Sequence, residues 1–144
     1  MIPAPRHHRG TTLVEILMVV TIMGTILTAG VPRLGRAFEG GRADLAAGTL
    51  RGLWNAERMY WLEHRFYTAD IDELIGHKFI DADVKSASDP FTYSLLLADE
   101  ESFSCQAVRN GSGLWSGALS LDESGVITGQ IEDGNGGIVT PYQD

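Results

Sequence analysis

An uninterrupted apolar run follows a short basic stretch at the start of the chain. From Thr11 to Val31 the sequence is almost wholly apolar, and Glu15 is its one charged residue. A helix rises about 1.5 Å per residue, so a run of this length just crosses a hydrocarbon core of about 30 Å. The pattern therefore predicts a membrane-spanning helix over residues 11–32.

The run is too long for the apolar part of a secretory signal, which has roughly 7 to 15 residues and is followed by small residues at a cleavage site. Here the run ends in Val31, Pro32 and Arg33. Basic residues flank both ends of the run, so the distribution of positive charge does not determine the orientation of the helix in the membrane. They are Arg6, Arg9, Arg33, Arg36 and Arg42.

Beyond Pro32 the pattern becomes amphipathic while it stays helical, which predicts a second helical segment over residues 33–64. Its predicted buried stripe consists of Leu34, Phe38, Leu45, Leu53 and Tyr60, widened by Ala46, Leu50, Trp54 and Trp61. Charged residues fill much of the remaining surface: Arg42, Asp44, Arg51, Glu57, Arg58 and Glu63. Gly40 and Gly41 could break this helix. For the aromatic residues, packing in the core is favoured over a ligand platform.

The remainder, residues 65–144, reads as a short helix followed by a β-rich half. Asp70 and Glu73 have the spacing of a capping box, and Gly76 is a plausible stop. Alternation then predicts four strands, over 91–98, 102–109, 114–121 and 126–131. Their short connections make the sheet antiparallel. Its inner face would come from Phe91, Thr92, Tyr93, Phe103 and the region of Trp115.

Composition limits the chain to one small globular domain beside the apolar segment. The chain has 144 residues and a formal charge of −8, which disfavours a surface for nucleic acid, and nothing else indicates one. Cys105 is the single cysteine, expected to be a small buried side chain. His64 and His77 lie in unrelated contexts, and no active site is evident, so the chain is not expected to be an enzyme. No cofactor is expected, although Asp133 and Asn135 are weak candidates for calcium.

Glu15 is the clue to function. A charged side chain in a membrane helix costs on the order of 3 kcal/mol at the bilayer centre, so it is kept where it finds a partner. In an ordinary anchor, Glu15 lies close enough to the end of the run to reach the lipid headgroups. Gly24 and Pro32 can likewise be simply tolerated, or can weaken the helix between them so that it melts locally.

The order of these features resembles the class III signal of type IV pilins and pseudopilins: a basic leader ending in Gly10, then Thr-Thr-Leu-Val-Glu, an apolar helix with Gly24, and Pro32. The resemblance implies a prepilin peptidase that cuts between Gly10 and Thr11 and methylates Thr11. It departs from the family at Thr11, where Phe is usual. It also implies an α+β fold, a long N-terminal helix packed on a small antiparallel sheet, which agrees with the pattern of residues 33–144.

Cleavage would place a new amine at Thr11, about 6 Å along the helix axis from Glu15. That distance is too long for a close pair within one helix, but the two groups could pair between neighbouring subunits. Loss of one member of such a pair in a medium of low dielectric costs about 3 to 5 kcal/mol. Glu15 would then determine the register of a filament.

The sequence therefore predicts a structural subunit of a type IV pilus-like filament. Its parts would be a leader (1–10), a membrane and polymerisation segment (11–32), the amphipathic helix of the globular domain (33–64), and a loop, short helix and sheet (65–144). The resemblance implies as partners further pilin-like subunits, prepilin peptidase, and an inner-membrane assembly platform with its ATPase. It also implies a precursor in the inner membrane with a cytoplasmic N-terminus, and a filament that is periplasmic or extracellular. The alternatives are a pseudopilin of type II secretion and a single-pass anchored binding protein that does not polymerise.

Overall fold

The computed structural model describes residues 12–86, 90–110 and 114–142, with the side chains of 29–32 and 86 left out. Its elements, in chain order, are α1 (Leu13–His64), α2 (Ile71–Gly76), α3 (Asp83–Ser86), β1 (Phe91–Ala98), β2 (Phe103–Arg109), β3 (Trp115–Asp122), β4 (Ile127–Asp133) and β5 (Ile138–Val139). The chain divides into two compact units, Met1–Gly35 and Arg36–Asp144. The expected α+β fold, a long N-terminal helix with an antiparallel sheet, is confirmed.

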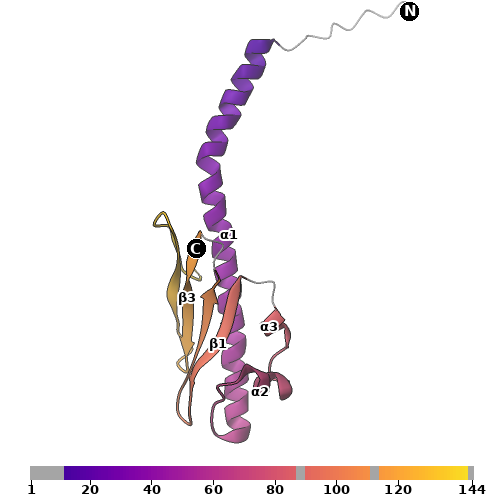
Figure 1. Cartoon of the computed structure of the whole chain (residues 1–144), viewed down its shortest axis with the longest axis vertical. Coiled ribbons are helices and arrows are strands. Elements are labelled where there is room, and N and C mark those ends of the chain that lie inside the picture. The colour runs from indigo at the N-terminus through magenta and orange to yellow at the C-terminus, as the bar shows by residue number, and fades with distance from the viewer. Residues whose placement is uncertain (1–11, 87–89, 111–113, 143–144) are drawn as a thin grey trace, which may run out of the picture. The chain divides into compact units, whose positions relative to one another are not determined.

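The five strands form one antiparallel sheet in the order β1-β2-β3-β4-β5, so each strand pairs with its neighbour in the sequence. Figure 1 shows the sheet lying along the C-terminal half of α1, with α2 and α3 beside that half of the helix. The four predicted strands are found within one or two residues of their expected bounds. The pattern missed β5, because a strand of two residues is too short to show alternation.

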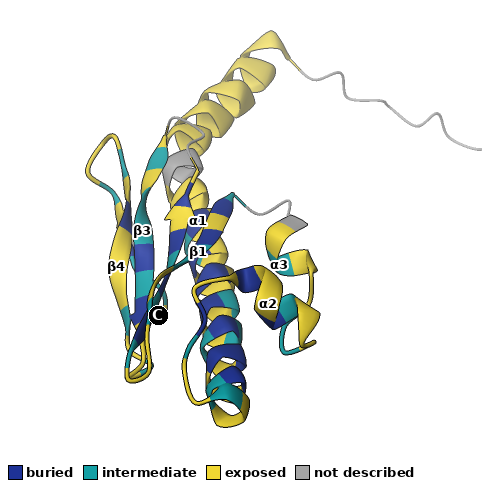
Figure 2. Cartoon of the chain, turned by 60° about the horizontal axis from the view of Figure 1, so that its bottom comes forward, coloured by how far each residue is buried: buried dark blue, intermediate teal, exposed yellow. Residues whose placement is uncertain are grey.

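Alternate side chains of the sheet pack against α1 to form the core of the second unit. Phe91, Tyr93 and Phe103 are buried there, as the sequence predicts, whereas Thr92 is exposed. Trp115 is half-buried and packs against the cluster. Cys105 is fully buried, as expected of a small apolar residue. Figure 2 shows buried residues on the sheet, on α2 and on the C-terminal half of α1, while the first turns of α1 are exposed.

The face of α1 that packs on the sheet differs from the predicted stripe. Leu34, Phe38 and Leu45 are exposed. Four predicted members are buried as expected: Ala46, Leu50, Leu53 and Tyr60. The rest of the buried face is formed by Glu39, Ala43, Ala47, Ala56 and Glu57, which were not predicted there. At roughly 100° per residue, the three exposed residues lie about 100° or more away from the centre of that face. Alanines occupy much of the buried face because their small side chains let the sheet approach the helix closely.

Gly40 and Gly41 do not break the helix, since α1 continues through both. Helix α2 begins as predicted, with Asp70 as its N-cap, and ends at Gly76. The capping box is incomplete, however. Asp70 accepts the N–H of Asp72 rather than that of Glu73, and the Glu73 carboxylate accepts hydrogen bonds from Tyr60 and Thr68 instead.

Glycine is required where β3 and β4 pair. Gly117 and Gly129 have φ values of 144° and 105°, a region that side-chain-bearing residues rarely adopt. A Cβ atom at Gly129 would lie 2.2 Å from the carbonyl oxygen of Ala118, and one at Gly117 would lie 2.3 Å from that of Gln130. The two strands can therefore approach each other only with glycine at these positions.

Candidate assembly site

Among the residues that the structure describes, α1 contains a stretch long and apolar enough to cross a membrane, with a mean hydropathy of 2.1 and none of it buried. Every large apolar side chain from Leu13 to Leu27 is between 49% and 75% exposed. A face of this size is not left in water by a folded protein unless something else covers it. The segment is therefore a candidate for contact with lipid and with other helices.

The hydroxyl groups of Thr21, Thr25 and Thr28 are satisfied within the helix. The hydroxyl groups of Thr21 and Thr28 donate to the carbonyl oxygens of Leu17 and Gly24, each at 2.8 Å, and that of Thr25 donates to Ile22 at the same distance. Such bonds leave no unpaired hydroxyl hydrogen facing an apolar medium. The threonines are thus compatible with a membrane helix.

Glu15 lies in the first turn of α1 and is exposed. Thr12 caps the helix, because its carbonyl oxygen and its hydroxyl accept the N–H of Glu15 at 3.0 and 3.3 Å. Within residues 12–86, 90–110 and 114–142, the Glu15 carboxylate has neither an ion pair nor a hydrogen bond. The charge of Glu15 is therefore not neutralised by any group in the described part of its own chain.

The other predicted site residues are placed as follows. Gly10 and Thr11 lie outside the described residues. The backbone is helical at Gly24 and at position 32, so the expected weakening of the helix stays a prediction. Asp133 is the last residue of β4, and Asn135 lies in the turn that follows; Asp133 Oδ1 accepts the N–H groups of Asn135 and Gly137 at 2.8 and 2.6 Å. These bonds give Asp133 a role in the turn, and calcium binding stays a prediction.

Sequence reasoning missed an ion pair between Glu39 and Arg109, both of which are buried on the sheet side of α1. Arg109 Nε and Nη2 donate to the two carboxylate oxygens at 2.5 and 3.3 Å, and Arg42 adds a third contact at 3.2 Å. Burial alone would raise the pKa of Glu39, but the bonds and charge of Arg109 outweigh it and lower the pKa. The pair ties α1 to β2.

Glu57 was expected on the surface, but it is fully buried. It lies seven residues after Leu50 and three before Tyr60, on the buried face of α1. Its Oε2 accepts the N–H of Thr68 at 3.1 Å, while Oε1 has no partner among the described residues. Burial raises the pKa of Glu57 to about 7, helped by the charge of Glu73 and opposed by the bond from Thr68.

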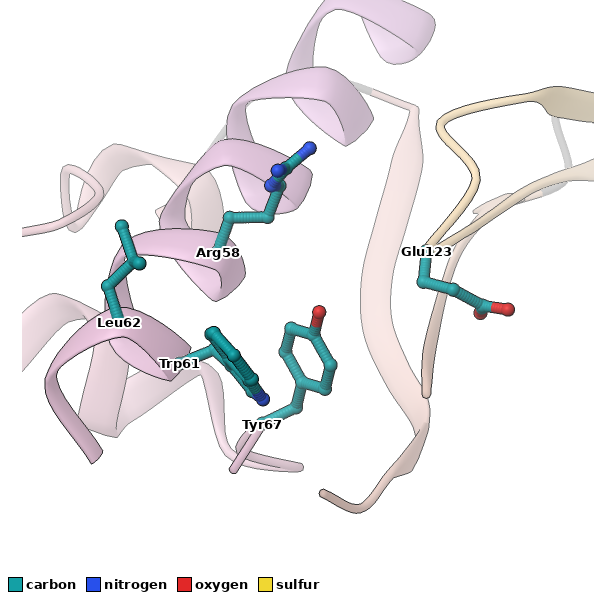
Figure 3. Close-up of a pocket in the computed structure, with 5 residues that line it drawn as sticks. All are labelled: Arg58, Trp61, Leu62, Tyr67 and Glu123. Carbon is teal, nitrogen blue, oxygen red and sulfur yellow. The ribbon is translucent and has the colours of Figure 1, made fainter. Parts of the chain in front are cut away.

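Aromatic residues join α1 to the turns of the sheet. The indole N–H groups of Trp54 and Trp61 donate to the carbonyl oxygens of Glu123 and Glu100 at 3.1 and 2.9 Å. Trp61 also lines an open pocket of about 350 Å³ together with Arg58, Leu62, Tyr67 and Glu123 (Figure 3). Trp54 and Trp61 are both half-buried. They therefore lie at the edge of the core, where they connect α1 to the sheet, and not at its centre.

His64 and His77 are not unrelated, contrary to the sequence prediction. Their ring centroids lie 4.9 Å apart, at an interplanar angle of 81°. They are brought together because two hydrogen bonds hold the following segment against α1. The N–H of Thr68 donates to Glu57, and the hydroxyl of Tyr60 donates to Glu73 of α2. The two histidines are 13 positions apart and belong to different elements, so no helical or strand periodicity in the sequence indicates this contact.

The long helix together with the antiparallel sheet forms an α+β architecture of the pilin-like class. No known family model matches the chain. The chain is similar to the type IV wide pilus major component PilA4 of Thermus thermophilus, with 25% identity over 113 residues. These residues make up 78% of this chain and 82% of that protein. The resemblance to the type IV pilins noted at the N-terminus is confirmed by this match.

Proposed function

We propose that this protein is a structural subunit of a type IV pilus-like filament and that Glu15 determines how subunits join. The observation that carries the proposal is the exposed apolar segment Leu13–Leu27, whose one carboxylate has no partner in the described part of the chain. The similarity to PilA4, a pilus component by its name, supports the same conclusion.

The apolar segment has two successive environments in this proposal. Lipid covers it before assembly, and the equivalent segments of neighbouring subunits cover it afterwards. Helix packing replaces lipid contacts with similar apolar contacts, so the exchange needs an additional interaction to be selective. The single charge of Glu15 is suited to supply it.

Glu15 would pair with the amine of Thr11 on an adjacent subunit. Cleavage between Gly10 and Thr11 creates that amine, and methylation of Thr11 leaves its positive charge in place. An unpaired charge in this environment costs about 3 to 5 kcal/mol, whereas the complete pair contributes little net stability. The interaction would therefore select the register of neighbouring subunits and exclude other registers.

The remaining parts of the chain follow from the same proposal. Residues 1–10 form the leader, 11–32 the membrane and polymerisation segment, 33–64 the helix of the globular domain, and 65–144 the loop, short helix and sheet. Prepilin peptidase and an inner-membrane platform with its ATPase would act on the precursor, whose N-terminus faces the cytoplasm. Weak helix bonding between Gly24 and Pro32 would let the segment extend under load.

Intact-mass and N-terminal analysis of the membrane-extracted protein tests this proposal. The expected result is a chain that begins at an N-methylated Thr11. A chain that retains Met1 would contradict the proposal and favour the single-pass anchor. Detection of the processed chain in filaments sheared from the cell surface would separate a surface pilus from a periplasmic pseudopilus of type II secretion.

A further inference from the structure

Three potential metal ligands lie close together at the C-terminal end of α1. Glu63 and His64 are the last residues of α1, and His77 is the C-cap of α2. One donor atom from each of them lies within 4.8 Å of the others. Two imidazoles and a carboxylate are donors that Zn²⁺ and related divalent ions accept together.

His64 is oriented for metal binding by a contact to its own helix. Its Nδ1 lies 3.2 Å from the carbonyl oxygen of Tyr60. A carbonyl can only accept, so Nδ1 donates to it, which leaves Nε2 as the nitrogen for a metal. A backbone carbonyl bound to the other ring nitrogen is a common support for metal-bound histidine. The ring is also stacked on that of Tyr60, with centroids 4.2 Å apart.

His77 is oriented by aromatic neighbours on two sides. Its ring lies parallel to that of Phe79, with centroids 5.6 Å apart and an angle of 11°, and it meets the Tyr60 ring edge-on at 5.5 Å. Its backbone N–H donates to the carbonyl oxygen of Glu73 at 3.0 Å. The two imidazoles are thus positioned by contacts that do not require a metal.

The charge around the cluster favours a cation. Glu63 contributes one carboxylate, and that of Glu73 lies near both histidines. Glu73 Oε2 accepts hydrogen bonds from the hydroxyl groups of Thr68 and Tyr60 at 2.6 and 3.0 Å, as a carboxylate does. A second negative charge therefore lies next to the imidazoles.

We propose that Glu63, His64 and His77 bind one divalent transition-metal ion of the Zn²⁺ type, which fastens the end of α1 to the turn after α2. In a tetrahedral site with bonds of about 2.0 to 2.1 Å, neighbouring ligand atoms lie about 3.3 Å apart. The donors must close by up to roughly 1.5 Å, and the exposed side chains of Glu63 and His77 are free to do so. Water completes the fourth position.

Titration of the full chain in detergent micelles with Co²⁺, followed by displacement with Zn²⁺, tests this site. Four-coordinate Co²⁺ absorbs visible light strongly, so the probe reports geometry as well as binding. We expect one equivalent of tetrahedral Co²⁺ in the wild type and an affinity at least tenfold lower in His77→Gln and Glu63→Gln. Both side chains are exposed, so these variants are expected to fold.

The matched control is a chain with His7→Gln and His8→Gln, which removes the other pair of histidines in the sequence. This variant should keep the same spectrum and affinity. Zn²⁺ should also raise the unfolding temperature of the wild type and of this control, but not that of His77→Gln. The proposal is overturned if the wild type shows no tetrahedral spectrum, if His77→Gln keeps it, or if the control loses it.

Discussion

Two carboxylates are buried on the same face of α1, and their surroundings give them opposite electrostatic properties. Glu39 has a full counter-ion in Arg109, whereas Glu57 has a single N–H donor and one oxygen without a partner among the described residues. The pKa of Glu39 is lowered and that of Glu57 is raised. The two residues therefore make stability depend on pH in opposite directions.

The raised pKa of Glu57 predicts a loss of stability as the pH increases. In the unfolded chain the carboxyl ionises near its ordinary value of 4.5, whereas in the fold it holds its proton up to about pH 7. The contribution is present in full below pH 4.5 and is lost by about pH 7, and it amounts to about 3 kcal/mol. Glu57→Gln should remove this dependence and be the more stable protein at pH 8.

Urea unfolding of the full chain in detergent, followed by tryptophan fluorescence at pH 5 and pH 8, checks this result. Glu101→Gln, an exposed change between β1 and β2, is the matched control and should leave the pH dependence of the wild type intact. A wild-type free energy of unfolding that does not fall between the two pH values would contradict the assignment.

The Glu39–Arg109 pair predicts a large cost when one partner is removed. Glu39→Ala leaves the guanidinium of Arg109 buried without its counter-ion, so the free energy of unfolding should fall by about 3 to 5 kcal/mol. The wild-type contribution is present above pH 4.5 and is lost as the pH falls, because the folded-state pKa is lowered.

Arg42→Ala removes the exposed contact to the same carboxylate and should cost less than about 1 kcal/mol. In the double variant Glu39→Met with Arg109→Met, much of the loss should be recovered, since apolar side chains of similar length replace the pair. Similar losses in Glu39→Ala and Arg42→Ala, measured by urea unfolding, would show that burial of the pair does not matter.

At the scale of elements, the apolar run and the alternation of the strands were sufficient to predict the helix and the sheet. The period of 3.6 residues was less informative for the C-terminal half of α1. Leu50, Leu53 and Tyr60 were predicted correctly in the buried face, but Phe38 and Leu45 are exposed. Alanines and two buried glutamates occupy the positions that the pattern did not assign to it. Burial of Glu39 depends on Arg109, which is 70 positions away, so no local pattern could indicate it.

The exposed residues Phe38 and Leu45, 64% and 71% accessible, predict a contact with another subunit. They lie roughly 20° apart around the helix, on a face that the sheet does not cover. Phe38→Ala with Leu45→Ala should change the free energy of unfolding by less than about 1 kcal/mol, because no buried contact is lost. The amount of subunit in sheared filaments should nevertheless fall severalfold.

Val126→Ala is a suitable control for this pair, because Val126 is 57% exposed but lies in a turn of the sheet. It should leave the filament yield unchanged. Quantitative immunoblotting of sheared and cell-bound fractions distinguishes the variants. Equal yields from all three proteins would mean that this face of α1 does not take part in assembly.

At the scale of the molecule, the chain combines a unit that has a buried apolar core with the segment Leu13–Leu27, whose large apolar side chains are all exposed. The second unit has its own core, and its C-terminal end is held to α1 by the bond from the backbone N–H of Tyr142 to Asp44 at 2.7 Å. The segment Leu13–Leu27 contributes nothing to that core. In the proposed function, its apolar character serves contact with lipid and with neighbouring subunits, and not the folding of the second unit.

Incorporation of Glu15 variants into filaments tests the central claim most directly. Glu15→Gln removes the charge but keeps a polar side chain three residues after the cap Thr12, a position where Glu and Gln are both favourable. We expect Glu15→Gln and Glu15→Ala to be inserted and cleaved before Thr11, as judged by mass, and to be depleted at least about tenfold from sheared filaments. Thr21→Ala, in the same segment, should assemble normally. Normal incorporation of Glu15→Gln would contradict the account, because it would show that assembly does not need the charge.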